Sequence, residues 1–151
     1  MIKENSKIEN LVFKFNDVEK INSIELANKK FLIYFYPKDD TPGCTKQAIG
    51  FSDQLKNFND MNVTIYGVSK DSFEKHEKFK LKHNLKIKLI SDDGSLCSYF
   101  GVWVEKSMYG KVYMGIDRST FFIDNLVVKK IWRKVKVKGH VDEVIDFIKN
   151  Y

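Results

Sequence analysis

The chain has 151 residues, 43% of them hydrophobic and 14% aromatic, which suits a single domain spanning residues 1–151 and argues against intrinsic disorder. Its net charge of +6 comes mostly from lysine, and we interpret it as a solvated surface and not as affinity for nucleic acid. The longest apolar run, "FLIYFY", is far too short for a membrane helix, and the N-terminus lacks the apolar core of a signal peptide, so we expect a cytoplasmic protein.

The first half of the chain predicts alternating strands and helices. Residues 11–26 read as two short strands around a turn, and residues 31–36 as a strand buried on both faces that Pro37 ends. A helix follows from Pro42, with an apolar stripe at positions 48, 51, 55 and 58. Residues 63–69 then predict another buried strand.

The second half of the chain predicts further helices and a strand, followed by two consecutive strands. A helix at 71–83 and a strand with a turn at 86–95 precede a short helix around Cys97. Two strands at 119–124 and 127–137, joined at Asn125, then lead to a last helix that starts near position 140. Buried parallel strands early and an antiparallel pair late predict an α/β, thioredoxin-like three-layer sandwich with a central mixed sheet between helices.

The helix after Pro37 has a well-specified start that carries a thiol. Thr41 suits the N-cap and Pro42 the first helical position, where its missing N–H costs nothing, so Cys44 falls on the third. Unpaired backbone N–H groups and the helix dipole favour an anion there, and therefore the thiolate. We interpret Cys44 as a prepared nucleophile; the alternative is a buried cysteine that only fills space.

Three stretches resemble one family. "FYPKDDTPGCTKQA", with "MYGKVYMGIDRSTFFID" and "WRKVKVKGHVDEV", is similar to the peroxiredoxins, in the branch of bacterioferritin comigratory protein or peroxiredoxin Q. The active-site motif of that family is a proline, three residues, a threonine or serine, two residues and a cysteine, which Pro37, Thr41 and Cys44 satisfy. The resemblance runs from about residue 31 to the end, and the first 30 residues match less well.

The resemblance implies thiol-dependent reduction of hydrogen peroxide and organic hydroperoxides, without a metal or organic cofactor. Cys44 would attack the O–O bond and become a sulfenic acid, Thr41 would hydrogen-bond peroxide and thiolate, and Pro37 would shield the site from water. The active-site arginine of the family falls on Arg118, one of only two arginines, although a strand-end ion pair with Asp117 is the plainer alternative. The family also implies a monomer, with a dimer as the alternative.

The thiol that resolves the sulfenic acid is missing from both positions where relatives carry it. Ile49 and Lys80 occupy those positions, so Cys97 is the only possible resolving cysteine. Cys97 attacking after local unfolding, a thiol from outside the chain, and Cys97 of a second subunit all stay open, with a preference for the outside thiol. That reductant would be thioredoxin, glutaredoxin or a small-molecule thiol.

Other signals are weaker. His76 and His83 favour partly exposed helix histidines over a metal site, because further ligands are missing. Lysines at 134, 136 and 138 alternate with valines as on an amphipathic strand.

Two alternative functions remain: a thioredoxin-fold thiol-disulfide reductase, which the absence of a CxxC disfavours, and a basic binding or chaperone-like protein with an incidental cysteine.

Overall fold

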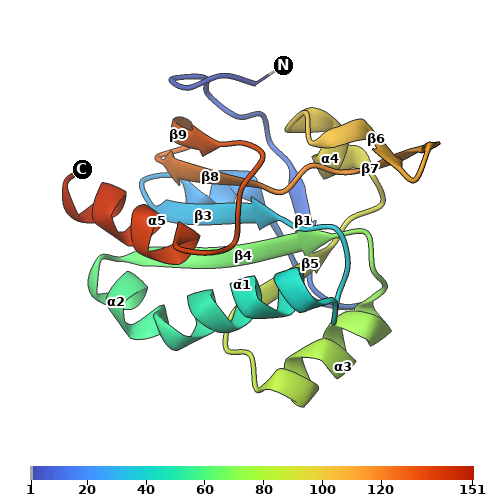
Figure 1. The fold of residues 1–151 in the computed structure, drawn as a ribbon. Coiled ribbons are helices and arrows are strands. Elements are labelled where there is room, and N and C mark those ends of the chain that lie inside the picture. The colour runs from blue at the N-terminus through green and yellow to red at the C-terminus, as the bar shows by residue number, and fades with distance from the viewer. Residues whose placement is uncertain (1) are drawn as a thin grey trace.

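One five-stranded mixed sheet organises residues 2–151, the part of the chain that the computed structural model describes (Figure 1). Its order is β5-β4-β3-β8-β9, in which β3, β4 and β5 run parallel while β8 is antiparallel to both β3 and β9. The strands of this sheet are β3 (Lys30–Phe35), β4 (Val63–Ser69), β5 (Lys88–Ser91), β8 (Ser119–Asp124) and β9 (Val127–Trp132).

Helices and hairpins cover the sheet and extend from it. The helices are η1 (Ser23–Leu26, a 3-10 turn), α1 (Pro42–Asp53), α2 (Leu55–Asp60), α3 (Phe73–His83), α4 (Ser95–Tyr99) and α5 (His140–Lys149). The two hairpins are formed by β1 (Val12–Lys14) with β2 (Lys20–Asn22), and by β6 (Trp103–Met108) with β7 (Lys111–Ile116). No helix within residues 2–151 is long and apolar enough to span a membrane.

The central strand β3 divides the core into two layers. Side chains of a strand alternate between the faces of its sheet, and every residue from 31 to 36 is buried. Leu32, Tyr34 and Tyr36 pack with the buried residues of α1, α2, α3 and α5, whereas Phe31, Ile33 and Phe35 pack with α4, β1 and the N-terminal segment. The sheet therefore separates the α1 layer from the α4 layer.

The expected order of parallel and antiparallel strands is confirmed, and three details are corrected. The hairpin β6–β7 was not predicted, because most of its residues are exposed and leave no one-sided apolar pattern. The helix from Pro42 breaks at Gln54 into α1 and α2. Strand β9 ends at Trp132, and Lys134 has a left-handed φ of 50°, so the basic stretch that follows alternates in exposure without extending the strand.

Candidate active site

The loop between β3 and α1 brings Cys44 to the edge of the sheet. Tyr36 continues the ladder of β3 by donating its N–H to the carbonyl of Val68 at 3.0 Å, and Pro37, which has no N–H, follows on the exposed side. Thr41 is the N-cap of α1 and Pro42 its first residue, so Cys44 lies at the third helical position as expected. The thiol is buried, with 2% of the residue exposed.

Arg118 lies over the sulfur of Cys44. Its Nη2 donates to Cys44 Sγ at 3.3 Å, and its Nη1 donates to Gln47 Oε1 at 2.6 Å, so one planar guanidinium contacts both residues at once. A fixed positive charge at this distance attracts negative charge on the sulfur. Gly43 leaves room for this approach, because a Cβ at that position would lie 3.3 Å from Arg118 Nη2, closer than ordinary van der Waals contact.

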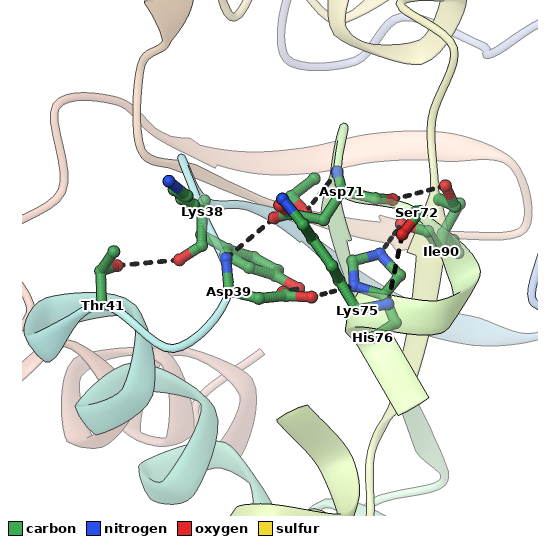
Figure 2. A network of polar contacts seen from close by, with 11 residues as sticks. Lys38, Asp39, Thr41, Asp71, Ser72, Lys75, His76 and Ile90 are labelled. Carbon is green, nitrogen blue, oxygen red and sulfur yellow. Dashed lines mark hydrogen bonds and ion pairs between the residues drawn. The ribbon is translucent and has the colours of Figure 1, made fainter. Parts of the chain in front are cut away.

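Thr41 uses its hydroxyl proton inside the loop. Its Oγ1 donates to the carbonyl of Lys38 at 2.8 Å (Figure 2), and its side chain makes no capping bond to the helix. A hydroxyl that donates in one direction keeps its lone pairs as acceptors. Thr41 can therefore accept a hydrogen bond from an O–H group that enters beside Cys44, but in this arrangement it has no proton left for the expected bond to the Cys44 thiolate.

Gln47 belongs to the same cluster and was not predicted. It is 1% exposed, and its Nε2 has no hydrogen-bond partner among the described residues. It also lines a groove of about 590 Å³ between α1 and the residues around Gly139. Its position is one helical turn after Cys44 and one before Phe51, and that spacing places it on the buried stripe.

We expect Gln47→Ala to slow the reaction of Cys44 with hydrogen peroxide about 10-fold. The substitution removes the acceptor that fixes Nη1 of Arg118, and hydrogen bonds to charged groups contribute about 1.5–3 kcal/mol, of which about 1.4 kcal/mol corresponds to tenfold in rate. Stopped-flow measurement of the second-order rate constant tests this. Gln54→Ala, at the end of the same helix, is the control, and a Gln47→Ala rate within twofold of the unchanged protein would contradict the prediction.

Cys97 lies in the other layer of the molecule. It is 0% exposed in α4 and packs with the core that contains Phe31, Ile33 and Phe35, whereas Cys44 packs with the core on the opposite face of β3. Both cysteines are free thiols. Burial raises the pKa of the Cys97 thiol well above its ordinary value, and the carboxylate of Asp92 raises it further, so Cys97 stays protonated at neutral pH.

The expectation that His76 is partly exposed is wrong. His76 is 2% exposed and lies within hydrogen-bond distance of Asp39 and of the carbonyl of Ile90, whereas His83 is half-buried and pairs with Asp40. His76 is three residues before Phe79, and that spacing indicates the buried face of α3. Within residues 2–151 no cluster of three or more His, Cys, Asp or Glu side chains could hold a metal ion.

Comparisons with known proteins identify the family of the chain. Residues 5–131 match the model of the AhpC/TSA family. The chain is 46% identical to Peroxiredoxin Bcp of Bacillus subtilis over 147 residues, which are 95% of this chain and 93% of that protein.

Solved structures show the same likeness in three dimensions. A bacterioferritin comigratory protein of Xanthomonas campestris, described for its alkyl peroxide reduction activity, superposes with a TM-score of 0.90 at 40% identity, covering 94% of this chain and 91% of that chain. A PrxQ mutant of Xylella fastidiosa superposes with a TM-score of 0.94 at 34% identity, covering 99% and 97%. The expected thioredoxin-like sandwich is thereby confirmed.

Proposed function

Because the chain belongs to the AhpC/TSA family and is a thiol-dependent peroxidase, a peroxiredoxin of the Bcp/PrxQ type, we propose that Cys44 is the thiol that attacks the peroxide. The contact between Arg118 Nη2 and Cys44 Sγ at 3.3 Å is the observation that carries this proposal. It pairs a thiol at a helix N-terminus with a permanent positive charge, which is how a sulfur nucleophile is activated.

The chemistry follows from the groups around the sulfur. The thiolate of Cys44 attacks the terminal oxygen of R–O–O–H, so an S–O bond forms while the O–O bond breaks and its electrons leave on RO⁻, which takes a proton to become water or an alcohol. Thr41 accepts a hydrogen bond from the incoming O–H, and Arg118 stabilises the charge that moves from sulfur to oxygen. Pro37 lies in the same loop, and its shielding of the site stays a prediction. Cys44 is left as a sulfenic acid.

An outside thiol, and not Cys97, returns Cys44 to its reduced form in this proposal. The first thiol would displace water from the sulfenic acid and form a mixed disulfide, and a second thiol would release Cys44 as the product disulfide forms. The opposite faces of β3 on which the two cysteines pack support this route, because a disulfide needs Cα atoms within about 7 Å. The complete burial of Cys97 also disfavours attack by Cys97 of a second subunit.

The cellular setting of the reaction completes the proposal. We propose hydrogen peroxide and organic hydroperoxides as substrates, with thioredoxin, glutaredoxin or a small-molecule thiol as the reductant. The alkyl peroxide activity named for the Xanthomonas campestris protein supports the organic substrates.

Two free cysteines suit a reducing compartment, which supports the cytoplasm. A single domain and a monomer stay predictions.

One equivalent of hydrogen peroxide should convert Cys44 to a sulfenic acid that dimedone traps, as peptide mass spectrometry would detect. The Cys97→Ser variant should give the same trapped product and keep turnover driven by dithiothreitol within twofold. An unmodified Cys44 in the treated protein would refute the proposed function. An intramolecular disulfide between Cys44 and Cys97 would leave the peroxidase function in place and refute only the outside-thiol route.

A further inference from the structure

A buried pair of polar side chains, Asp39 and His76, lies next to the loop that carries Thr41. Asp39 Oδ2, in the loop, and His76 Nδ1, on α3, are 2.6 Å apart, and their side chains are 5% and 3% exposed. The other carboxylate oxygen of Asp39 accepts from the hydroxyl of Tyr36 at 2.6 Å. Figure 2 shows Asp39 and His76 pointing toward each other between the loop and the helix.

The partners of His76 fix the orientation of its ring. The Nε2 atom lies 2.9 Å from the carbonyl oxygen of Ile90, which can only accept, and Nδ1 faces the carboxylate of Asp39. Burial raises the pKa of Tyr36 well above its ordinary value, so this hydroxyl keeps its proton and donates it to Asp39. The Nε2 N–H of His76 therefore donates to Ile90, and a proton between Asp39 Oδ2 and His76 Nδ1 joins the two side chains, so all four polar atoms of the pair have partners.

The main chain of the loop is also held by a hydrogen bond at Asp39. The N–H of Asp39 donates to Asp71 Oδ2 at 2.8 Å, and that oxygen also accepts from the hydroxyl of Ser69 at 2.8 Å. The next residue, Asp40, has a left-handed φ of 57°, a conformation that needs support from its surroundings. Side chain and backbone of Asp39 together hold the loop against β4 and α3.

This anchor lies inside the short segment that sets the site. Thr41 comes two residues after Asp39, and the carbonyl that accepts from the hydroxyl of Thr41 belongs to Lys38, the residue before Asp39. A shift at Asp39 would therefore move both ends of that hydrogen bond, and with it the first turn of α1 that carries Cys44. We propose that Asp39 and His76 are positioning residues that hold Thr41 and Cys44 in the arrangement that reacts with peroxide. This inference rests on the proposed role of Cys44.

Asp39→Asn and His76→Gln should slow the reaction of Cys44 with peroxide without slowing its alkylation. Either change disrupts a buried hydrogen-bonded pair, and a displacement of about 1 Å at a reacting centre costs about 10²-fold in rate, so we expect the rate constant with hydrogen peroxide to fall by about that factor. Alkylation of Cys44 by iodoacetamide needs no such alignment. Its rate should stay equal or rise, because the buried thiol becomes more accessible. Both rates are measured by mass spectrometry in a Cys97→Ser background, at a temperature where circular dichroism shows the variants folded.

The chain offers a matched control pair on the same two elements. Asp40 pairs with Lys82 at 2.7 Å and with His83 at 2.8 Å, but its side chain is 44% exposed. Exposed ion pairs contribute little, so Asp40→Asn and His83→Gln should keep the ratio of peroxide rate to alkylation rate within twofold. Tyr36→Phe is a milder change that removes one donor from Asp39 and keeps its contact with His76, and it should lower the ratio severalfold.

The outcomes distinguish this inference from the function on which it rests. A ratio within twofold of the unchanged protein in Asp39→Asn, His76→Gln and Tyr36→Phe would overturn it, and so would an equal loss in the control variants. Parallel losses of both rates would point to a structural role only and would also overturn it. A double variant that loses no more than the worse single variant would support one coupled unit. Cys44→Ser that still consumed peroxide would instead refute the proposed function.

Discussion

Cys44→Ser should abolish peroxide consumption, lowering the rate by at least about 10³-fold. A serine hydroxyl stays protonated at neutral pH even beside Arg118, and its oxygen cannot take up the peroxide oxygen as sulfur does, so no intermediate forms. Loss of a nucleophile removes its whole catalytic unit, which is why the expected effect is the largest in the molecule. Consumption of hydrogen peroxide with excess dithiothreitol is the measurement.

Cys97→Ser is the control for this substitution. Both changes replace a buried free thiol by a hydroxyl of similar size, so a general cost of burying a polar group would affect both variants. Only the change at Cys44 should affect turnover. Equal losses in two folded variants, or full activity of Cys44→Ser, would contradict the assignment of Cys44 as the peroxidatic thiol.

Local signals made the Cys44 helix predictable from sequence. The Thr41 and Pro42 pair defines a helix start within two residues, because each residue suits a backbone position that few others fit. The strand at 31–36 was equally clear, since β3 is buried on both faces and its apolar run is continuous. Both features depend on a few neighbouring residues, and both were predicted.

Contacts between distant segments could not be read in this way. Arg118 and Cys44 are 74 residues apart, and only the position of β8 beside β3 brings them together. The separation of Cys44 from Cys97 likewise depends on which face of the sheet each helix covers. Sequence alone therefore leaves three routes for the resolving step open, and the opposite faces on which the two cysteines pack support the outside thiol.

The burial of two polar residues, Gln47 and His76, could have been predicted from their helical spacing. Gln47 lies on the apolar stripe of its helix, three residues after Cys44, and His76 has the same spacing to Phe79. A polar residue on a buried stripe must find partners, because burial without a hydrogen bond is costly. Gln47 accepts from Arg118 through its oxygen, and His76 contacts Asp39 of the active-site loop, so in this chain both polar residues on apolar helix faces point to the site.

Arg118→Met should lower the rate constant with hydrogen peroxide by about 10²-fold to 10³-fold, the range seen when one donor is removed from a preorganised anionic site. The guanidinium contributes charge at Cys44 and a second donor to Gln47. Arg118→Lys keeps the charge but cannot reach both partners through a planar fork, so we expect an intermediate loss of about 10-fold. Single-turnover oxidation of Cys44, followed by mass spectrometry, measures these rates.

Arg133, the second arginine of the chain, provides a control that tests whether the position of the positive charge matters. Arg133 donates to the carbonyls of Phe100 and Gly101 at 3.3 Å and lies over the ring of Phe121, in the layer opposite Cys44. Arg133→Lys should therefore leave the rate within twofold, although both variants change an arginine that is partly buried. If Arg118→Lys matched Arg133→Lys, a positive charge alone would suffice at the sulfur. The fork to Gln47 would then have no part in the reaction.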